Sequence, residues 1–130
     1  MSFILDIDLD YFGLFNDPII KLVKILRWAD RPVDSIIDLH HKALKEWSKA
    51  IKKGLIDKPI FILHIDEHHD MLGETPPVQF GNFIFFALQQ WPDCHVHWLT
   101  RNPIDHPQMW LSESAWELVS GRSIGFLVSQ

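Results

Sequence analysis

Two short apolar segments of this 130-residue chain each run into a cluster of acidic side chains. Residues 3–9 and 59–65 are rich in β-branched and aromatic residues, which predicts that both form strands. In an extended chain every second side chain points to the same face, so the members of each cluster share a face. Like charges on one face repel one another unless they are solvated, protonated or bound to a cation. The clusters comprise Asp6, Asp8 and Asp10 at the end of the first segment, and Asp66, His68 and Asp70 after the second.

Between and after these segments the chain alternates between predicted helices and strands. Asp17 and Pro18 supply an N-cap and a first-turn proline for a helix that extends to Trp28. Further helices are expected at 33–53, 80–91 and 112–119, and further strands at 95–99 and 123–128. This alternation predicts a three-layer α/β fold, with a mainly parallel sheet flanked by helices, in one domain spanning residues 1–130.

The position of the acidic clusters predicts a shared site. Ligands of open α/β sheets bind beyond the carboxyl ends of the strands, and both clusters lie at such ends. If the two strands are parallel neighbours, joined by the helices of residues 17–53, the clusters meet. Carboxylate and imidazole ligands together favour Mn²⁺, Fe²⁺ or Zn²⁺ over Ca²⁺. The alternative for the first segment is an exposed edge strand that uses its charges to prevent aggregation.

Composition narrows the possible partners. The net charge is −5 and no basic stripe occurs, which argues against nucleic acid as a partner. The amino-terminal apolar run is broken at Asp6, and no stretch approaches the roughly 18 apolar residues of a membrane span, so no membrane partner is expected. A single cysteine, Cys94, fits a reducing cytoplasm. We expect a cytoplasmic protein that acts on a small-molecule or peptide substrate.

The acidic segments resemble motifs of the arginase, agmatinase and deacetylase superfamily. Residues 64–70 (HIDEHHD) are similar to its H-x-D-A-H-x-D metal strand, and residues 6–10 (DIDLD) to its S-x-D-x-D motif, with Asp6 in place of the serine. A closer likeness is to a family of ureohydrolase-like proteins that includes peptide arginases. Its LDIDLDFF, H-H-x-A-L and H-x-D-A-H-x-D-L motifs are similar to residues 5–12, 40–44 and 64–72.

The resemblance implies an arginase-like but much shortened fold with two Mn²⁺ ions, or Fe²⁺ or Zn²⁺ in their place. It implies a ureohydrolase that cleaves arginine side chains in a peptide by means of a metal-bound hydroxide. His69 or His64 would protonate the leaving amine. The alternatives are a loop-exposed His69, and a buried His64 bonded to a backbone carbonyl. The metal ligands implied are Asp66, His68, Asp70, Asp8, Asp10 and His40.

Other features depart from the family pattern. Ile84 stands where arginases carry a proton-shuttling histidine, the two acidic strands occur in reversed order, and the chain is far shorter than an arginase. His40 also has an alternative as a core residue on the apolar face of the 33–53 helix. A truncated or minimal member, or a non-catalytic metal- or partner-binding module, is therefore a second hypothesis. A third is a haloacid-dehalogenase-type phosphatase, which Asp8, Asp10 and Thr100 mimic.

Overall fold

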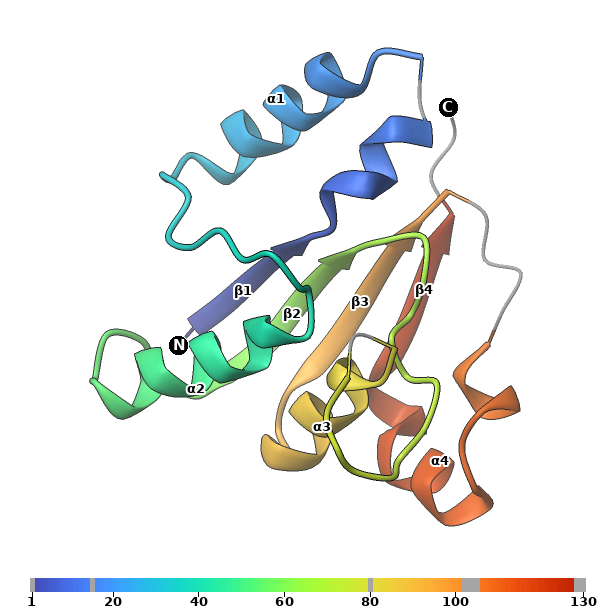
Figure 1. Ribbon diagram of the computed structural model, residues 1–130. Helices are drawn as coiled ribbons and strands as arrows, with labels where there is room; N and C mark the ends of the chain where they lie inside the picture. The colour runs from blue at the N-terminus through green and yellow to red at the C-terminus, as the bar shows by residue number, and fades with distance from the viewer. Residues whose placement is uncertain (1, 15, 80, 102–105, 128–130) are drawn as a thin grey trace.

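The computed structural model describes residues 2–14, 16–79, 81–101 and 106–127 (Figure 1). These residues form one sheet of four parallel strands with α-helices packed against it, so the predicted α/β class is confirmed. The strands are β1 (Ser2–Ile7), β2 (Pro59–Ile65), β3 (His95–Thr100) and β4 (Ser123–Leu127). The α-helices are α1 (Pro18–Ala29), α2 (Lys42–Lys52), α3 (Phe83–Gln90) and α4 (Glu113–Val119). Three short 3-10 helices are η1 (Leu9–Leu14), η2 (Pro107–Met109) and η3 (Ser120–Arg122).

The strands lie in the order β1-β2-β3-β4, each paired in parallel with the next. Their carboxyl ends therefore share one edge of the sheet, as Figure 1 shows for β1 and β2. The register places Asp6 beside His64, and His64 beside Trp98. Polar side chains of neighbouring strands thus meet near the carboxyl edge of the sheet.

The larger core lies between one sheet face and helices α2, α3 and α4. Ile4, Ile62 and Val96 point into it from three adjacent strands. Helix α3 is nearly all apolar and supplies most of the opposing surface, because almost all of its first six residues are buried. Burying large aromatic and aliphatic side chains is the main stabilising contribution here, at roughly 1.5–3 kcal/mol each.

The opposite face is covered only in part by η1 and α1, and Phe3 on this face is 65% exposed. Tyr11 and Phe12 of η1 are buried against Ile65, while Leu22 and Ile25 of α1 are only partly buried. No residue of α1 is fully buried, so this helix lies loosely on its face. Helices on both sides of the parallel sheet are consistent with the predicted three-layer arrangement.

The long helix predicted over residues 33–53 is confirmed from Lys42 to Lys52 and is wrong before that. Residues 32–37 have no regular structure and α2 begins only at Lys42. Ile36 is 83% exposed, so the apolar periodicity that suggested a helix finds no core to pack against there. A helix of this length depends on packing of its apolar face rather than on propensity alone. His40 consequently lies in the turn before α2 and not on a helix face.

The first predicted strand is too long at its carboxyl end. It ends at Ile7, and η1 begins at Leu9, so the alternation of side chains stops there. Asp10 is carried onto the 3-10 helix, where it is exposed. The alternative of a charged, exposed edge strand is also wrong for Asp6, which is buried.

The remaining elements lie close to their predicted positions. Helix α1 begins at Pro18, although the Asp17 side chain makes no capping hydrogen bond. Helix α4 is capped by Ser112, whose Oγ accepts from the Ala115 N–H at 3.2 Å. Helix α3 begins at Phe83, and the ends predicted at Phe80 and Val128 lie outside the described residues. Within the described part of the chain, every helix falls short of the length and apolar character needed to cross a bilayer.

Candidate metal centre

The carboxyl ends of β1 and β2 bring the two acidic clusters together. Hydrogen bonding continues one residue past each strand: the Asp8 N–H donates to the Ile65 carbonyl at 2.9 Å, and the Asp66 N–H to the Leu99 carbonyl at 3.2 Å. Both aspartates are therefore held at the sheet edge by backbone bonds. Asp66 is also fixed by the indole N–H of Trp98, which donates to its carbonyl at 2.8 Å in a buried position.

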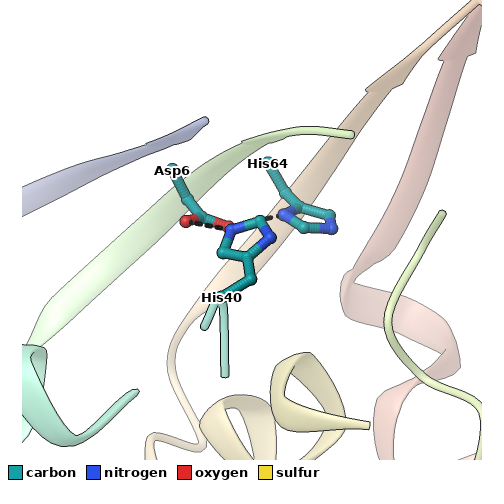
Figure 2. A group of neighbouring side chains, drawn as sticks. All are labelled: Asp6, His40 and His64. Atoms are coloured by element: carbon teal, nitrogen blue, oxygen red, sulfur yellow. Dashed lines mark hydrogen bonds and ion pairs between the residues drawn. The ribbon is translucent and has the colours of Figure 1, made fainter. Parts of the chain in front are cut away.

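A buried carboxylate joins two histidines beneath this edge (Figure 2). Asp6 Oδ1 lies 2.6 Å from Nε2 of His40, and Asp6 Oδ2 lies 2.6 Å from Nδ1 of His64. Asp6 comes from β1, His64 from the adjacent position on β2, and His40 from the turn before α2. Three segments far apart in sequence are thus tied together by one side chain.

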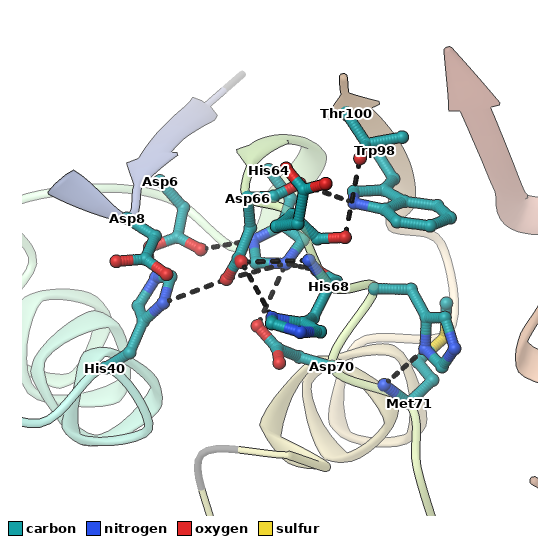
Figure 3. Close-up of polar contacts among 12 residues, drawn as sticks. Asp6, Asp8, His40, His64, Asp66, His68, Asp70, Met71, Trp98 and Thr100 are labelled. Atoms are coloured by element: carbon teal, nitrogen blue, oxygen red, sulfur yellow. Dashed lines mark hydrogen bonds and ion pairs between the residues drawn. The ribbon is translucent and has the colours of Figure 1, made fainter. Parts of the chain in front are cut away.

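His40 faces Asp66 with its other ring nitrogen (Figure 3). His40 Nδ1 lies 3.3 Å from Asp66 Oδ2, and ligand atoms of Asp8, His40 and Asp66 all lie within 4.8 Å of one another. Two ligands about 2.1 Å from one ion are about 3.0–3.4 Å apart at angles between square and tetrahedral. The spacing of Nδ1 and Oδ2 therefore suits neighbouring ligands of a single divalent ion.

Hydrogen bonds to the backbone orient the carboxylates of this group. Asp66 Oδ1 accepts from the His68 N–H at 2.9 Å, which leaves Oδ2 directed at His40. Asp8 Oδ1 accepts from the Asp10 N–H at 3.1 Å, so the loop after β1 turns around the Asp8 side chain. Each carboxylate keeps one oxygen for the shared space between them.

Asp70 closes the site from the loop after β2. Its backbone is left-handed, with φ of 57°, which aspartate tolerates better than most residues. Its carbonyl accepts from the Ile84 N–H at 3.1 Å and so anchors the loop to the start of α3. Ligand atoms of His64, Asp66 and Asp70 lie within 4.8 Å of one another.

One oxygen of Asp70 is buried without a hydrogen bond from any described residue. Asp70 Oδ2 lies 3.0 Å from His64 Nε2, but the hydrogen on that nitrogen points to the His68 carbonyl at 2.9 Å. The ion pair with His64 offsets only part of the cost of burying this oxygen, because the pKa of Asp70 is still raised. A cation in the site would satisfy this oxygen, so the residues present fit a metal ion.

The two histidines of the group are held in their charged form. Burial alone would lower the pKa of His40, but its hydrogen bonds to Asp6 and Asp66 raise the pKa to about 10. Burial acts in the same way on His64, but its hydrogen bond to Asp6 and the nearby charge of Asp70 raise its pKa well above the ordinary value. The same contacts hold the pKa of Asp6 below its ordinary value against the effect of burial.

Repulsion between the carboxylates acts in the opposite direction. Burial, with Asp66 nearby, raises the pKa of Asp70 to about 7, and the same two causes raise the pKa of Asp8. The pKa of Asp66 itself is lowered, because bonds and charges from His40 and His64 outweigh its burial. The carboxylates outnumber the imidazole rings, so the site gathers an excess of acidic groups whose repulsion a divalent cation would offset.

Two of the predicted ligands are not brought into this group. The side chain of His68 is 66% exposed, with Nδ1 3.6 Å from Asp66 Oδ1. Asp10 is exposed on η1. Both predictions extended strand alternation past the ends of β1 and β2, where the chain already bends.

His64 and His69, the two predicted proton donors, are both buried but have different hydrogen-bond partners. His64 is fully buried and bonded to the His68 carbonyl, which is the structural alternative that we described for it. His69 is also buried rather than loop-exposed; its ring packs edge-on against Trp98, and its Nδ1 accepts from the Met71 N–H at 2.9 Å. Ile84, which the motif resemblance aligns with a histidine of arginases, is fully buried in the core.

Asp6 is the site residue that the sequence did not single out. Asp6 stands where the family motif has a serine, and the pattern predicts only that it belongs to an acidic strand, without a ligand or positioning role. Its signal was its place in the first acidic cluster, two residues before Asp8 on the same strand face.

Comparisons with known proteins gave no match: no family model, no curated protein and no solved structure is significantly similar to this chain. The likeness to arginases therefore stays a prediction that depends on the short motifs alone.

Proposed function

We propose that this chain binds a divalent transition-metal ion at Asp8, His40 and Asp66, with Asp70 adjoining through Asp66, and that it uses the ion to hydrolyse a C–N bond of the ureohydrolase type. The observation that carries the metal site is the 3.3 Å separation of His40 Nδ1 and Asp66 Oδ2 beside a buried, unsatisfied oxygen of Asp70. The reaction type is supported by the motif resemblance. Mixed nitrogen and oxygen donors favour Mn²⁺, Fe²⁺ or Zn²⁺.

The chemistry follows from the charges of the site. A divalent ion bound there would lower the pKa of a coordinated water toward neutrality and so supply a nucleophile. The four carboxylates offset the charge of the ion, and the buried His64 pairs with Asp6 and Asp70. His68 is the exposed imidazole nearest to Asp66, so it is the candidate to complete the donor set or to protonate a leaving amine.

Metal binding is tested by titrating chelator-treated protein with Mn²⁺ or Zn²⁺ while recording the melting temperature and metal content. Wild type should gain stability and retain metal through gel filtration. Asp66→Asn should lose most of both effects, because Asp66 contacts every other member of the group. Asp93→Asn removes an exposed carboxylate before β3, at the other end of the sheet, and should behave as wild type. Equal metal retention by wild type and Asp66→Asn would reject the site.

Turnover is tested separately. Metal-loaded protein should release urea from a peptide that contains internal arginine, and Asp66→Asn should not. Retained metal without urea release from peptides or free arginine would support the non-catalytic metal-binding module. That second candidate is favoured by Ile84, which fills the core where arginases have a histidine.

The phosphatase hypothesis has less support. Strand β2 lies between β1 and β3, so Thr100 is two strands, roughly 10 Å, away from the strand that carries Asp8. The Thr100 hydroxyl also donates to the Glu67 carbonyl at 3.4 Å. A Mg²⁺-dependent release of phosphate from a generic aryl phosphate would revive it.

A further inference from the structure

We infer that Asp6 is a positioning residue that makes Nδ1 of His40, rather than Nε2, the nitrogen that binds the metal. The inference rests on the proposed metal site and deepens it. Metal-bound histidines commonly donate their other ring N–H to a carboxylate or carbonyl, which fixes the orientation and tautomer of the ring. Asp6 occupies that place behind His40 (Figure 2).

The contact with Asp6 leaves Nδ1 as the one nitrogen of His40 available to bind a metal ion. Its Nε2 is 2.6 Å from Asp6 Oδ1, and a carboxylate can only accept, so Nε2 must carry a hydrogen. Nδ1 lies 3.3 Å from Asp66 Oδ2 on the other side of the ring. A metal ion bound between these two atoms would therefore replace the proton that Nδ1 carries.

Packing holds the ring in this orientation. The His40 ring lies 4.8 Å from the ring of Phe83, centroid to centroid, and its side chain is 16% exposed. Turning the ring over to present Nε2 would break the bond to Asp6 and leave a carboxylate that is only 6% exposed with an unused oxygen. Such a loss is expected to be costly in a buried position.

A carboxylate is specifically required at this position. Both oxygens of Asp6 accept a hydrogen from a histidine, one from His40 and one from His64. An asparagine amide has one accepting oxygen and would present N–H groups to one of the two rings. A hydroxyl would be too short to reach both. The exchange Asp6→Asn therefore removes one positioning bond while it keeps the size of the side chain.

The direct test is nuclear magnetic resonance of ¹⁵N-histidine-labelled wild type loaded with Zn²⁺ as a diamagnetic probe. Two-bond proton–nitrogen correlations should show Zn²⁺ on Nδ1 of His40 and a hydrogen on Nε2. Zn²⁺ on Nε2 of His40 would overturn the inference while leaving the metal site intact. Wild type that binds no Zn²⁺ would reject the proposed site itself, so the two failures are distinguishable.

A variant series gives a second readout. Asp6→Asn should bind Zn²⁺ about 10–100-fold more weakly, the usual range for loss of a supporting carboxylate. Its His40 signals should show mixed tautomers when loaded, and Asp93→Asn should match wild type in both measurements. A folded Asp6→Asn, judged by its dispersed amide spectrum, that retains wild-type affinity and a single Nδ1-bound species would overturn the inference. The wild-type spectrum decides the question if Asp6→Asn does not fold.

Discussion

Replacing Asp70 by asparagine should have opposite effects on the metal-free and the metal-loaded protein. In the metal-free protein, burial and the nearby Asp66 raise the pKa of Asp70 from 3.8 to about 7. Asp70 Oδ2 has no hydrogen bond from a described residue. Asparagine cannot ionise and keeps the shape, so it removes the cost of this charge. With metal bound, the same exchange removes a charged ligand.

The magnitude follows from proton linkage. The pKa of Asp70 rises by roughly 3 units on folding, and each unit corresponds to about 1.4 kcal/mol, so the ionised group costs on the order of 4 kcal/mol. The folded state holds the proton more tightly, so this cost is absent below pH 3.8, grows as the pH rises, and is complete above about pH 7. Asp70→Asn should therefore stabilise the metal-free protein by roughly 2–4 kcal/mol at pH 8 and by almost nothing near pH 4.

The assay is urea denaturation of chelator-treated wild type and Asp70→Asn between pH 4 and 8, followed by intrinsic tryptophan fluorescence. Adding Mn²⁺ at pH 8 should stabilise wild type and have much less effect on the variant. Asp93→Asn, an exposed carboxylate exchange, should stay within about 0.5 kcal/mol of wild type throughout. A difference between wild type and Asp70→Asn that does not change with pH would refute the reasoning, because the raised pKa would then not exist.

Three further exchanges test the core and the surroundings of the site. Trp98→Phe removes the buried donor to the Asp66 carbonyl and should lower the unfolding free energy by about 1–3 kcal/mol in urea denaturation; no loss would mean that water replaces the indole. Ile84→His places a polar ring in the core and should cost about 2 kcal/mol or more, without a gain in urea release. A stable Ile84→His with faster urea release would contradict that. Arg122→Met removes the Nη1 donor to three carbonyls between residues 88 and 94 and should cost about 2–4 kcal/mol in thermal denaturation, whereas exposed Arg31→Met should be neutral.

Local patterns predicted most of the fold. The residues of β2 and β3 favour a strand and those of α3 favour a helix, and all three elements pack against a core. Propensity and tertiary context therefore agree for them. The segment 33–41 has the apolar spacing of a helix, but Val33, Ile36 and Leu39 are exposed and only Ile37 packs against the core, so its pattern was misleading. Periodicity predicts which face a helix would bury, and only the surrounding elements decide whether that face is covered.

Part of the candidate site was also predictable from the sequence. Asp8 and Asp66 were expected to meet because they end two strands, and the parallel pairing of β1 with β2 brings them together. His68 and Asp10 were expected from the same alternation, which fails once each strand has ended. In both cases the direction of the backbone changes where the strand ends. That direction depends on the loop that follows, which the alternation pattern does not describe.

The sequence by itself determined that acidic side chains follow two apolar strands, and hence that a parallel sheet would gather negative charge at one edge. Only the tertiary structure decided which atoms face one another there. Asp6 bonds to His40 across 34 positions of sequence and to His64 across 58. Contacts of that range depend on strand register and on the path of the turn before α2. Neither is encoded in the local preferences of the residues involved, because each is settled by how the whole core packs.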